Sequence, residues 1–192
     1  MSGTDSETGI WDISIAKKRH KLDEGLTRKM VETFPIPMLA ADLGCGIGHY
    51  CKLLRELGWP EVHGYEGTQG IAEVAVYGDI FTVDFTKRRF VNIPYDFVLC
   101  IEVGEHVPPQ HEQVLLDNVA DYCAGYLVMS WAEPGQYSAS GHVNCRENKY
   151  VIEQMWERGF RRLRGETNEL RAAADLKWLK NTVLAFRRVD GR

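Results

Sequence analysis

The sequence predicts an α/β protein built on a single doubly wound, mostly parallel seven-stranded sheet whose last strand is antiparallel. Three observations indicate this fold. Predicted strands alternate with predicted helices along the chain, a glycine-rich loop follows the first strand, and residues 97–103 are almost continuously apolar, as expected for a strand covered on both faces. The length of 192 residues suits one domain. We expect residues 1–10 to be a flexible leader and residues 11–192 to fold.

Two helices and four strands are predicted in the first half of the chain. Apolar residues recur at helical spacing over residues 22–34, where Pro35 and Pro37 follow, and over residues 50–57, where Gly58 and Pro60 follow. Shorter apolar or alternating runs predict strands at residues 38–43, 62–66, 80–85 and 97–103.

The second half continues the alternation. Helices are predicted at residues 111–123, 149–158 and 170–179, and strands at residues 126–131, 160–165 and 182–189. In an open sheet of this kind a ligand binds at the carboxyl ends of the strands, which is where the glycine-rich loop should lie.

Charge and cysteine content limit the classes of function. The net charge of −4 gives no general attraction for nucleic acid, and the short basic run at residues 161–164 is typical of a solvated strand edge. Five cysteines without CxxC spacing indicate a reduced, cytoplasmic protein. No apolar run approaches the ~20 residues that span a bilayer, so we expect no membrane partner.

The segment ADLGCGIGH, residues 41–49, carries the first functional signal. Gly44, Gly46 and Gly48 follow a strand and precede a helix, so the backbone can turn tightly and approach a ligand closely. Cys45 between them is a small filler residue with no activating neighbour in the sequence. This spacing alone would also serve a dinucleotide.

Two acidic residues narrow the choice of cofactor. Glu66 ends the second predicted strand, 20 residues after Gly46, where a carboxylate can accept hydrogen bonds from both hydroxyls of a ribose. Asp42 lies two residues before Gly44, and a carboxylate so close would repel a pyrophosphate but suit a cationic ligand.

On these residues the chain resembles the class I S-adenosylmethionine-dependent methyltransferases, over about residues 22–188. The resemblance implies that the glycine loop holds the methionine part of S-adenosylmethionine and that Glu66 holds its ribose. It also implies an acid after the third strand for the adenine, for which Asp84 is the first choice and Asp79 the second. Alternatively, Asp84 only caps a turn. Cys45 within the loop, Phe85, Ile101 and Glu102 complete the expected cofactor contacts.

The fourth predicted strand runs into a second group, Glu102, Glu105 and His106, and a later glycine- and serine-rich loop returns His142 toward the same edge. This pattern resembles the metal-dependent O-methyltransferases that act on ubiquinone precursors and on the 3′ end of small RNAs. By that resemblance these four residues would bind a divalent ion, and their oxygen and imidazole ligands would permit Mg²⁺, Mn²⁺, Fe²⁺, Co²⁺ or Zn²⁺. Many metal-free methyltransferases carry a similar run, however.

Other interpretations stay open. Without a metal, His106 or His142 would act as a general base, with Glu105 beside it, or His106 would only satisfy a backbone group. A nicotinamide-dependent oxidoreductase and a catalytically silent binding subunit are further alternatives. We favour O-methylation over N-methylation and a small-molecule acceptor over a nucleic-acid 3′ end. The sequence does not indicate the oligomeric state.

Three aromatic residues also border the expected site. Trp131 and Tyr137, with Gln136, would form a substrate wall, or Trp131 would be the packed end of a strand. Trp11 would close over the site as part of a lid, or belong to an ordinary packed leader. His20, His49, His63 and His111 have no evident partners and are interpreted as surface or helix-end residues.

Overall fold

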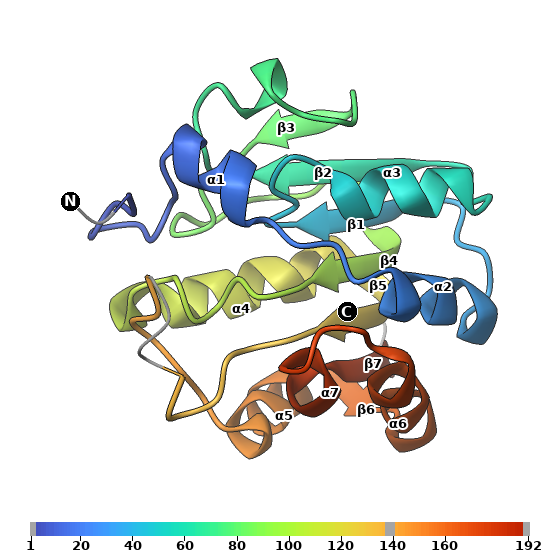
Figure 1. Ribbon diagram of the computed structural model, residues 1–192. Helices are drawn as coiled ribbons and strands as arrows, with labels where there is room; N and C mark the ends of the chain where they lie inside the picture. The colour runs from blue at the N-terminus through green and yellow to red at the C-terminus, as the bar shows by residue number, and fades with distance from the viewer. Residues whose placement is uncertain (1–2, 137–140, 190–192) are drawn as a thin grey trace.

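The computed structural model describes residues 3–136 and 141–189 and contains one seven-stranded sheet in the order β3-β2-β1-β4-β5-β7-β6 (Figure 1). The strands are β1 (Ala40–Leu43), β2 (Val62–Glu66), β3 (Ile80–Thr82), β4 (Tyr95–Cys100), β5 (Cys123–Met129), β6 (Phe160–Arg162) and β7 (Leu184–Arg188).

The sheet is parallel except at β7. Asp42 on β1 pairs with Gly64 on β2 and with Leu99 on β4, both in parallel register. β7 runs antiparallel to β5 and to β6. The predicted fold class is therefore confirmed, including the antiparallel last strand.

Helices cover both faces of the sheet, as the nearly continuous apolar strands require. On one face, α2 (Glu24–Thr33), α3 (His49–Glu56), α6 (Arg164–Ala173) and α7 (Leu179–Thr182) pack around Trp59 and Phe97. On the other, α4 (Glu112–Tyr122) and α5 (Asn148–Glu157) pack around Trp131 and Phe160. Two short 3₁₀ helices, η1 (Ile71–Glu73) and η2 (Pro109–His111), lie in the connections.

Several predicted boundaries are wrong. The predicted helix 170–179 is two helices, α6 and α7, because the backbone is extended at Ala174, the C-cap of α6. The predicted strand 160–165 ends at Arg162, since Arg164 already begins α6. The predicted strand 80–85 is shorter for a similar reason. After Thr82 the chain turns, and the Asp84 side chain accepts hydrogen bonds from the backbone N–H and hydroxyl of Thr86.

The N-terminal segment lies along the carboxyl edge of the sheet. Thr4 and Trp11 form an isolated antiparallel bridge, and α1 (Ile13–Arg19) then begins with Asp12 as its N-cap. Figure 1 shows α1 beside the arrowheads of β1 and β2. None of the helices in the described part of the chain is long and apolar enough to cross a membrane.

Candidate functional site

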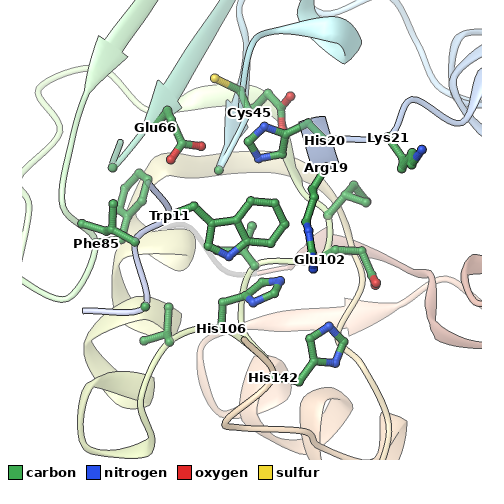
Figure 2. Close-up of a pocket in the computed structure, with 18 of the residues that line it drawn as sticks. Trp11, Arg19, His20, Lys21, Cys45, Glu66, Phe85, Glu102, His106 and His142 are labelled. Atoms are coloured by element: carbon green, nitrogen blue, oxygen red, sulfur yellow. The ribbon is translucent and has the colours of Figure 1, made fainter. Parts of the chain in front are cut away.

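A cavity of about 720 Å³ opens at the carboxyl edge of the strands (Figure 2). Of the residues predicted to bind a cofactor, eight line it: Asp42, Gly44, Cys45, Glu66, Asp84, Phe85, Ile101 and Glu102. His106 and His142 line the same cavity. The sheet edge thus brings both predicted groups of residues into one space.

The glycine loop has the backbone that its sequence predicts, but Gly46 and Gly48 do not line the cavity. Gly46 has a φ of +57°, and a Cβ placed there would lie 2.0 Å from the ring nitrogen Nδ1 of His20. The His20 ring therefore covers the loop at this point. Burial raises the pKa of the Cys45 thiol well above its usual value, which agrees with Cys45 as an inert filler.

Glu66 is buried, and its carboxylate is largely used within the protein. One oxygen accepts the backbone N–H of Gly46 at 2.9 Å, and the other accepts the backbone N–H and the hydroxyl of Thr68, both at 3.0 Å. A carboxylate has about four lone-pair positions. About one therefore remains for a ligand, so Glu66 both ties the glycine loop to β2 and faces the cavity.

Asp42 at the end of β1 is 2% exposed. Burial, opposed by a hydrogen bond from Cys51 and assisted by the charge of Glu66, raises the pKa of its carboxyl to about 7. A cationic ligand group beside Asp42 would favour the ionised form. The residue is therefore suited to the role that the sequence predicts for it.

The structure distinguishes the two candidates for the adenine contact. Asp84 lines the cavity, whereas Asp79 is exposed and does not. The Asp84 carboxylate also holds its own turn through Thr86 and pairs with Lys87 at 3.1 Å. Asp84 therefore both stabilises its own turn and lines the cavity.

Glu102 follows β4 with a φ of +57°, the one non-glycine residue of the described chain in the left-handed region. Ser130, directly after β5, holds it in place: the Ser130 hydroxyl accepts the Glu102 backbone N–H at 2.8 Å and donates to its carboxylate at 2.7 Å. Strained backbone of this kind is concentrated at functional sites. The sequence gives no signal for the role of Ser130.

Glu105, His106 and His142 form a cluster that could hold a metal ion, with one potential ligand atom from each residue within 4.8 Å of the others. Glu102 is not part of this three-residue group. Glu105 is fully buried, and neither of its carboxylate oxygens has a hydrogen-bond partner among the described residues. Burial and the charge of Glu102 raise its pKa well above the usual value.

Both imidazoles of the cluster are held in the neutral form. Burial and the neighbouring His142 lower the pKa of His106 to about 4, and burial lowers that of His142. His106 Nδ1 lies 3.0 Å from the carbonyl oxygen of Gly141, which can only accept, so Nδ1 carries the proton and Nε2 has a free lone pair. A neutral ring with one nitrogen anchored is the form in which histidine binds a metal or accepts a proton.

Glu112 on α4 anchors the loop that carries His142. This buried carboxylate accepts Nε of Arg146 at 2.6 Å, Nδ2 of Asn144 at 2.9 Å and the hydroxyl of Tyr150. The backbone N–H groups of Val143 and Asn144 donate to the Glu105 carbonyl at 2.8 and 3.0 Å. These contacts fix His142 against His106, with their ring centroids 4.9 Å apart.

Two residues of the N-terminal segment lie in the middle of the cavity. The Trp11 ring stacks on His20 with centroids 5.2 Å apart and meets His106 edge-on at 4.8 Å. His20 is the C-cap of α1, so of the two interpretations, surface or helix-end residue, the second applies, and its ring is half-buried. Trp131 is 2% exposed and donates to the Asn144 carbonyl, whereas Gln136 lines the cavity. Tyr137 lies outside the described residues.

The strand order, with an antiparallel β7, and the glycine loop after β1 are those of the class I methyltransferase fold. The sequence model of the methyltransferase domain family matches residues 16–179, and the chain belongs to this family. Among curated protein sequences, none matches the chain closely enough to count as a relative.

Solved structures share the fold at low sequence identity. Magnesium protoporphyrin IX methyltransferase from Synechocystis PCC 6803 with bound S-adenosylhomocysteine is 18% identical, with a TM-score of 0.67, over 86% of this chain and 81% of that chain. The N-methyltransferase NodS from Bradyrhizobium japonicum WM9, also with S-adenosylhomocysteine, is 14% identical, with a TM-score of 0.65, over 86% of this chain and 84% of that chain. The sugar N-methyltransferase KedS8 from Streptoalloteichus sp ATCC 53650 is 13% identical, with a TM-score of 0.66, over 87% and 86%.

Proposed function

We propose that this protein transfers the methyl group of S-adenosylmethionine to an oxygen of a small-molecule acceptor. The observation that carries the proposal is the single cavity in which Asp42 and Glu66 lie beside His106 and His142. Membership of the methyltransferase domain family supports the activity. The neighbours with bound S-adenosylmethionine or S-adenosylhomocysteine support the cofactor.

The cofactor would lie along the ends of β1 and β2. Asp42 would attract the ammonium group of the methionine part, and the free lone pair of Glu66 would accept one ribose hydroxyl. Asp84 and Phe85 would border the adenine. Because the sulfonium group is already activated, the protein has to position the acceptor and remove its proton.

We propose further that Glu105, His106 and His142 hold a divalent ion at the acceptor side, with Glu102 next to them. The buried carboxylate of Glu105, whose oxygens have no partner among the described residues, supports this assignment. One carboxylate and two neutral imidazoles suit Mn²⁺, Fe²⁺, Co²⁺ or Zn²⁺ better than Mg²⁺. Such an ion lowers the pKa of an acceptor hydroxyl. The chain's own part is to keep His106 Nε2 free through the bond from Nδ1 to Gly141.

Calorimetry tests the cofactor. S-adenosylhomocysteine should bind the wild type, Glu66→Ala should weaken its binding, and NAD should not bind. Binding of NAD but not of S-adenosylhomocysteine would refute the methyltransferase proposal. Release of S-adenosylhomocysteine from S-adenosylmethionine, with a panel of phenols and catechols, then separates an enzyme from a silent binding subunit.

The metal is tested by binding and by activity. Mn²⁺ should bind the wild type, and His142→Ala should abolish this binding while leaving the affinity for S-adenosylhomocysteine unchanged. Methyl transfer should stop in a chelator and return when the ion is added. Full activity in the chelator would remove the metal and leave His106 or His142 as the base.

A further inference from the structure

The mouth of the cavity is lined by three positively charged residues of the N-terminal segment, Lys18, Arg19 and Lys21. All three are exposed, and none of them pairs with a carboxylate among the described residues. The chain as a whole carries a net charge of −4, so this concentration of positive charge at one opening is not a general property of its surface.

Helix stability explains only part of this pattern. Lys17, Lys18 and Arg19 occupy the last turn of α1, where positive charge interacts favourably with the helix dipole. Lys21 lies beyond the C-cap, His20, and gains nothing from that interaction. Lys17 has the same place in the helix but does not line the cavity. The helix dipole therefore does not account for Lys21, and it does not explain why Arg19 lines the cavity while Lys17 does not.

The position of Arg19 separates it from the cofactor residues. In Figure 2 the Trp11 ring lies between two sides of the cavity, with Glu66 and Phe85 on one side and Arg19, Glu102 and His142 on the other. The first side carries the ribose and adenine positions of the proposed function. Arg19 shares the second side with the proposed acceptor-activating residues.

We infer that the methyl acceptor carries an anionic group, a carboxylate or a phosphate, which Arg19 and Lys21 bind at the cavity mouth. This inference rests on the proposed function. The buried acidic residues Asp42 and Glu66 line the cavity, whereas the cations that line it are exposed, so the charges orient such an acceptor with its acid toward the cations. Its acid stays at Arg19, and its hydroxyl points inward to His106.

The test uses matched acceptors with and without the acid. Hydroxybenzoates such as 3,4-dihydroxybenzoate, together with aryl phosphates, are compared with neutral alcohols of the same shape, such as 3,4-dihydroxybenzyl alcohol. Binding is measured on protein saturated with S-adenosylhomocysteine, and methyl transfer is measured with S-adenosylmethionine. In the wild type the acids should bind more tightly than their neutral partners.

The variants Arg19→Gln and Lys21→Gln should each weaken the binding of the acids by about three- to tenfold and leave the binding of the neutral compounds unchanged. An ion pair at the surface contributes little to affinity, and a partly enclosed pair contributes more. Lys17→Gln is the matched control, with the same charge change on the same helix, and should alter neither.

Three results would overturn the inference. The acids and neutral compounds could bind equally across the panel, or neither could bind. Alternatively, Arg19→Gln could weaken the binding of S-adenosylhomocysteine itself, which would mean that the cations bind the carboxylate of the cofactor. Failure of the wild type to bind S-adenosylhomocysteine at all would instead refute the proposed function, so the two failures are distinguishable.

Discussion

The anchoring of the His142 loop by Glu112 leads to a quantitative prediction. Glutamine at this position keeps the shape of the side chain, and its oxygen can still accept from Asn144 and Arg146 while its amide turns to the Tyr150 hydroxyl. The charge assistance is lost, which we expect to cost about 1–2 kcal/mol of the free energy of unfolding. Alanine leaves the donors without an acceptor and should cost about 3–4 kcal/mol.

The expected loss of stability is reduced because water can solvate the groups that Glu112 leaves unpaired. The Arg146 side chain is 35% exposed and can reach water when Glu112 is removed, so the full penalty of an isolated buried charge does not apply. For a chain of 192 residues, each kcal/mol shifts Tm by about 2–4 °C. Glu112→Gln should therefore lower Tm by about 2–8 °C and Glu112→Ala by about 6–16 °C, as measured by calorimetry.

The stability that Glu112 contributes should be lost at acid pH. Burial raises the pKa of Glu112, but the hydrogen bonds from Tyr150, Arg146 and Asn144 outweigh burial and hold it below the usual value. The stabilisation from ionised Glu112 is therefore complete above the pKa of the unfolded chain, about 4.5. It is lost as the pH falls through the lower pKa of the folded protein. The difference in stability between wild type and Glu112→Gln should be constant from pH 7 to about 5.5 and shrink near pH 4.

The assay also separates anchoring from general stability. At a temperature where both variants are folded, the affinity for S-adenosylhomocysteine should stay unchanged, while Mn²⁺ affinity and methyl transfer fall because His142 is no longer fixed. Glu153→Gln is the matched control on α5, where an exposed pair with Lys149 at 3.8 Å should contribute under about 1 kcal/mol. An unchanged Tm in Glu112→Ala, or an unshrinking difference at pH 4, would refute the reasoning.

Three further predictions concern the cofactor side. Glu66→Gln should weaken the binding of S-adenosylhomocysteine at least tenfold in calorimetry. The two carboxylate oxygens accept from Gly46 and Thr68, and an amide has only one oxygen to accept with. Unchanged affinity would exclude a ligand role for Glu66. Affinity for this ligand should fall as the pH drops below about 7, where Asp42 takes up a proton, and Asp42→Asn should flatten that profile. Gly46→Ala should displace His20 and weaken the same binding, whereas Gly78→Ala, with open space around it, should not.

Most of the sheet could be predicted from the sequence because parallel strands buried on both faces are read as apolar runs. β4 is the clearest example, with four consecutive buried residues from Phe97 to Cys100. The third strand was harder, since Phe81 and Thr82 are exposed at the sheet edge. α1 was not predicted at all. Its seven residues bury only Ala16, which leaves no apolar periodicity to detect.

The site could be predicted where it follows from strand ends, and not where it depends on distant segments. Asp42, Glu66 and Glu102 each end or follow a strand of the parallel sheet, so they had to meet at one edge. Trp11 and His20 reach the same cavity through the path of the chain before α2. Nothing in their local sequence fixes that path.

The two sides of the cavity rest on different parts of the fold. The cofactor side is built on adjacent strands whose register fixes Asp42 against Gly64 and Leu99, so a change there disturbs the sheet itself. The proposed acceptor side includes the segment before α2 and the loop after β5. Trp11 of the first meets His106 edge-on, and Asn144 of the second donates to Glu112 on α4. On the proposed function, substitutions in those two segments should change the binding of the acceptor without changing the binding of the cofactor. The charge at Arg19 and the position of His142 are therefore the features that should determine which molecule is methylated.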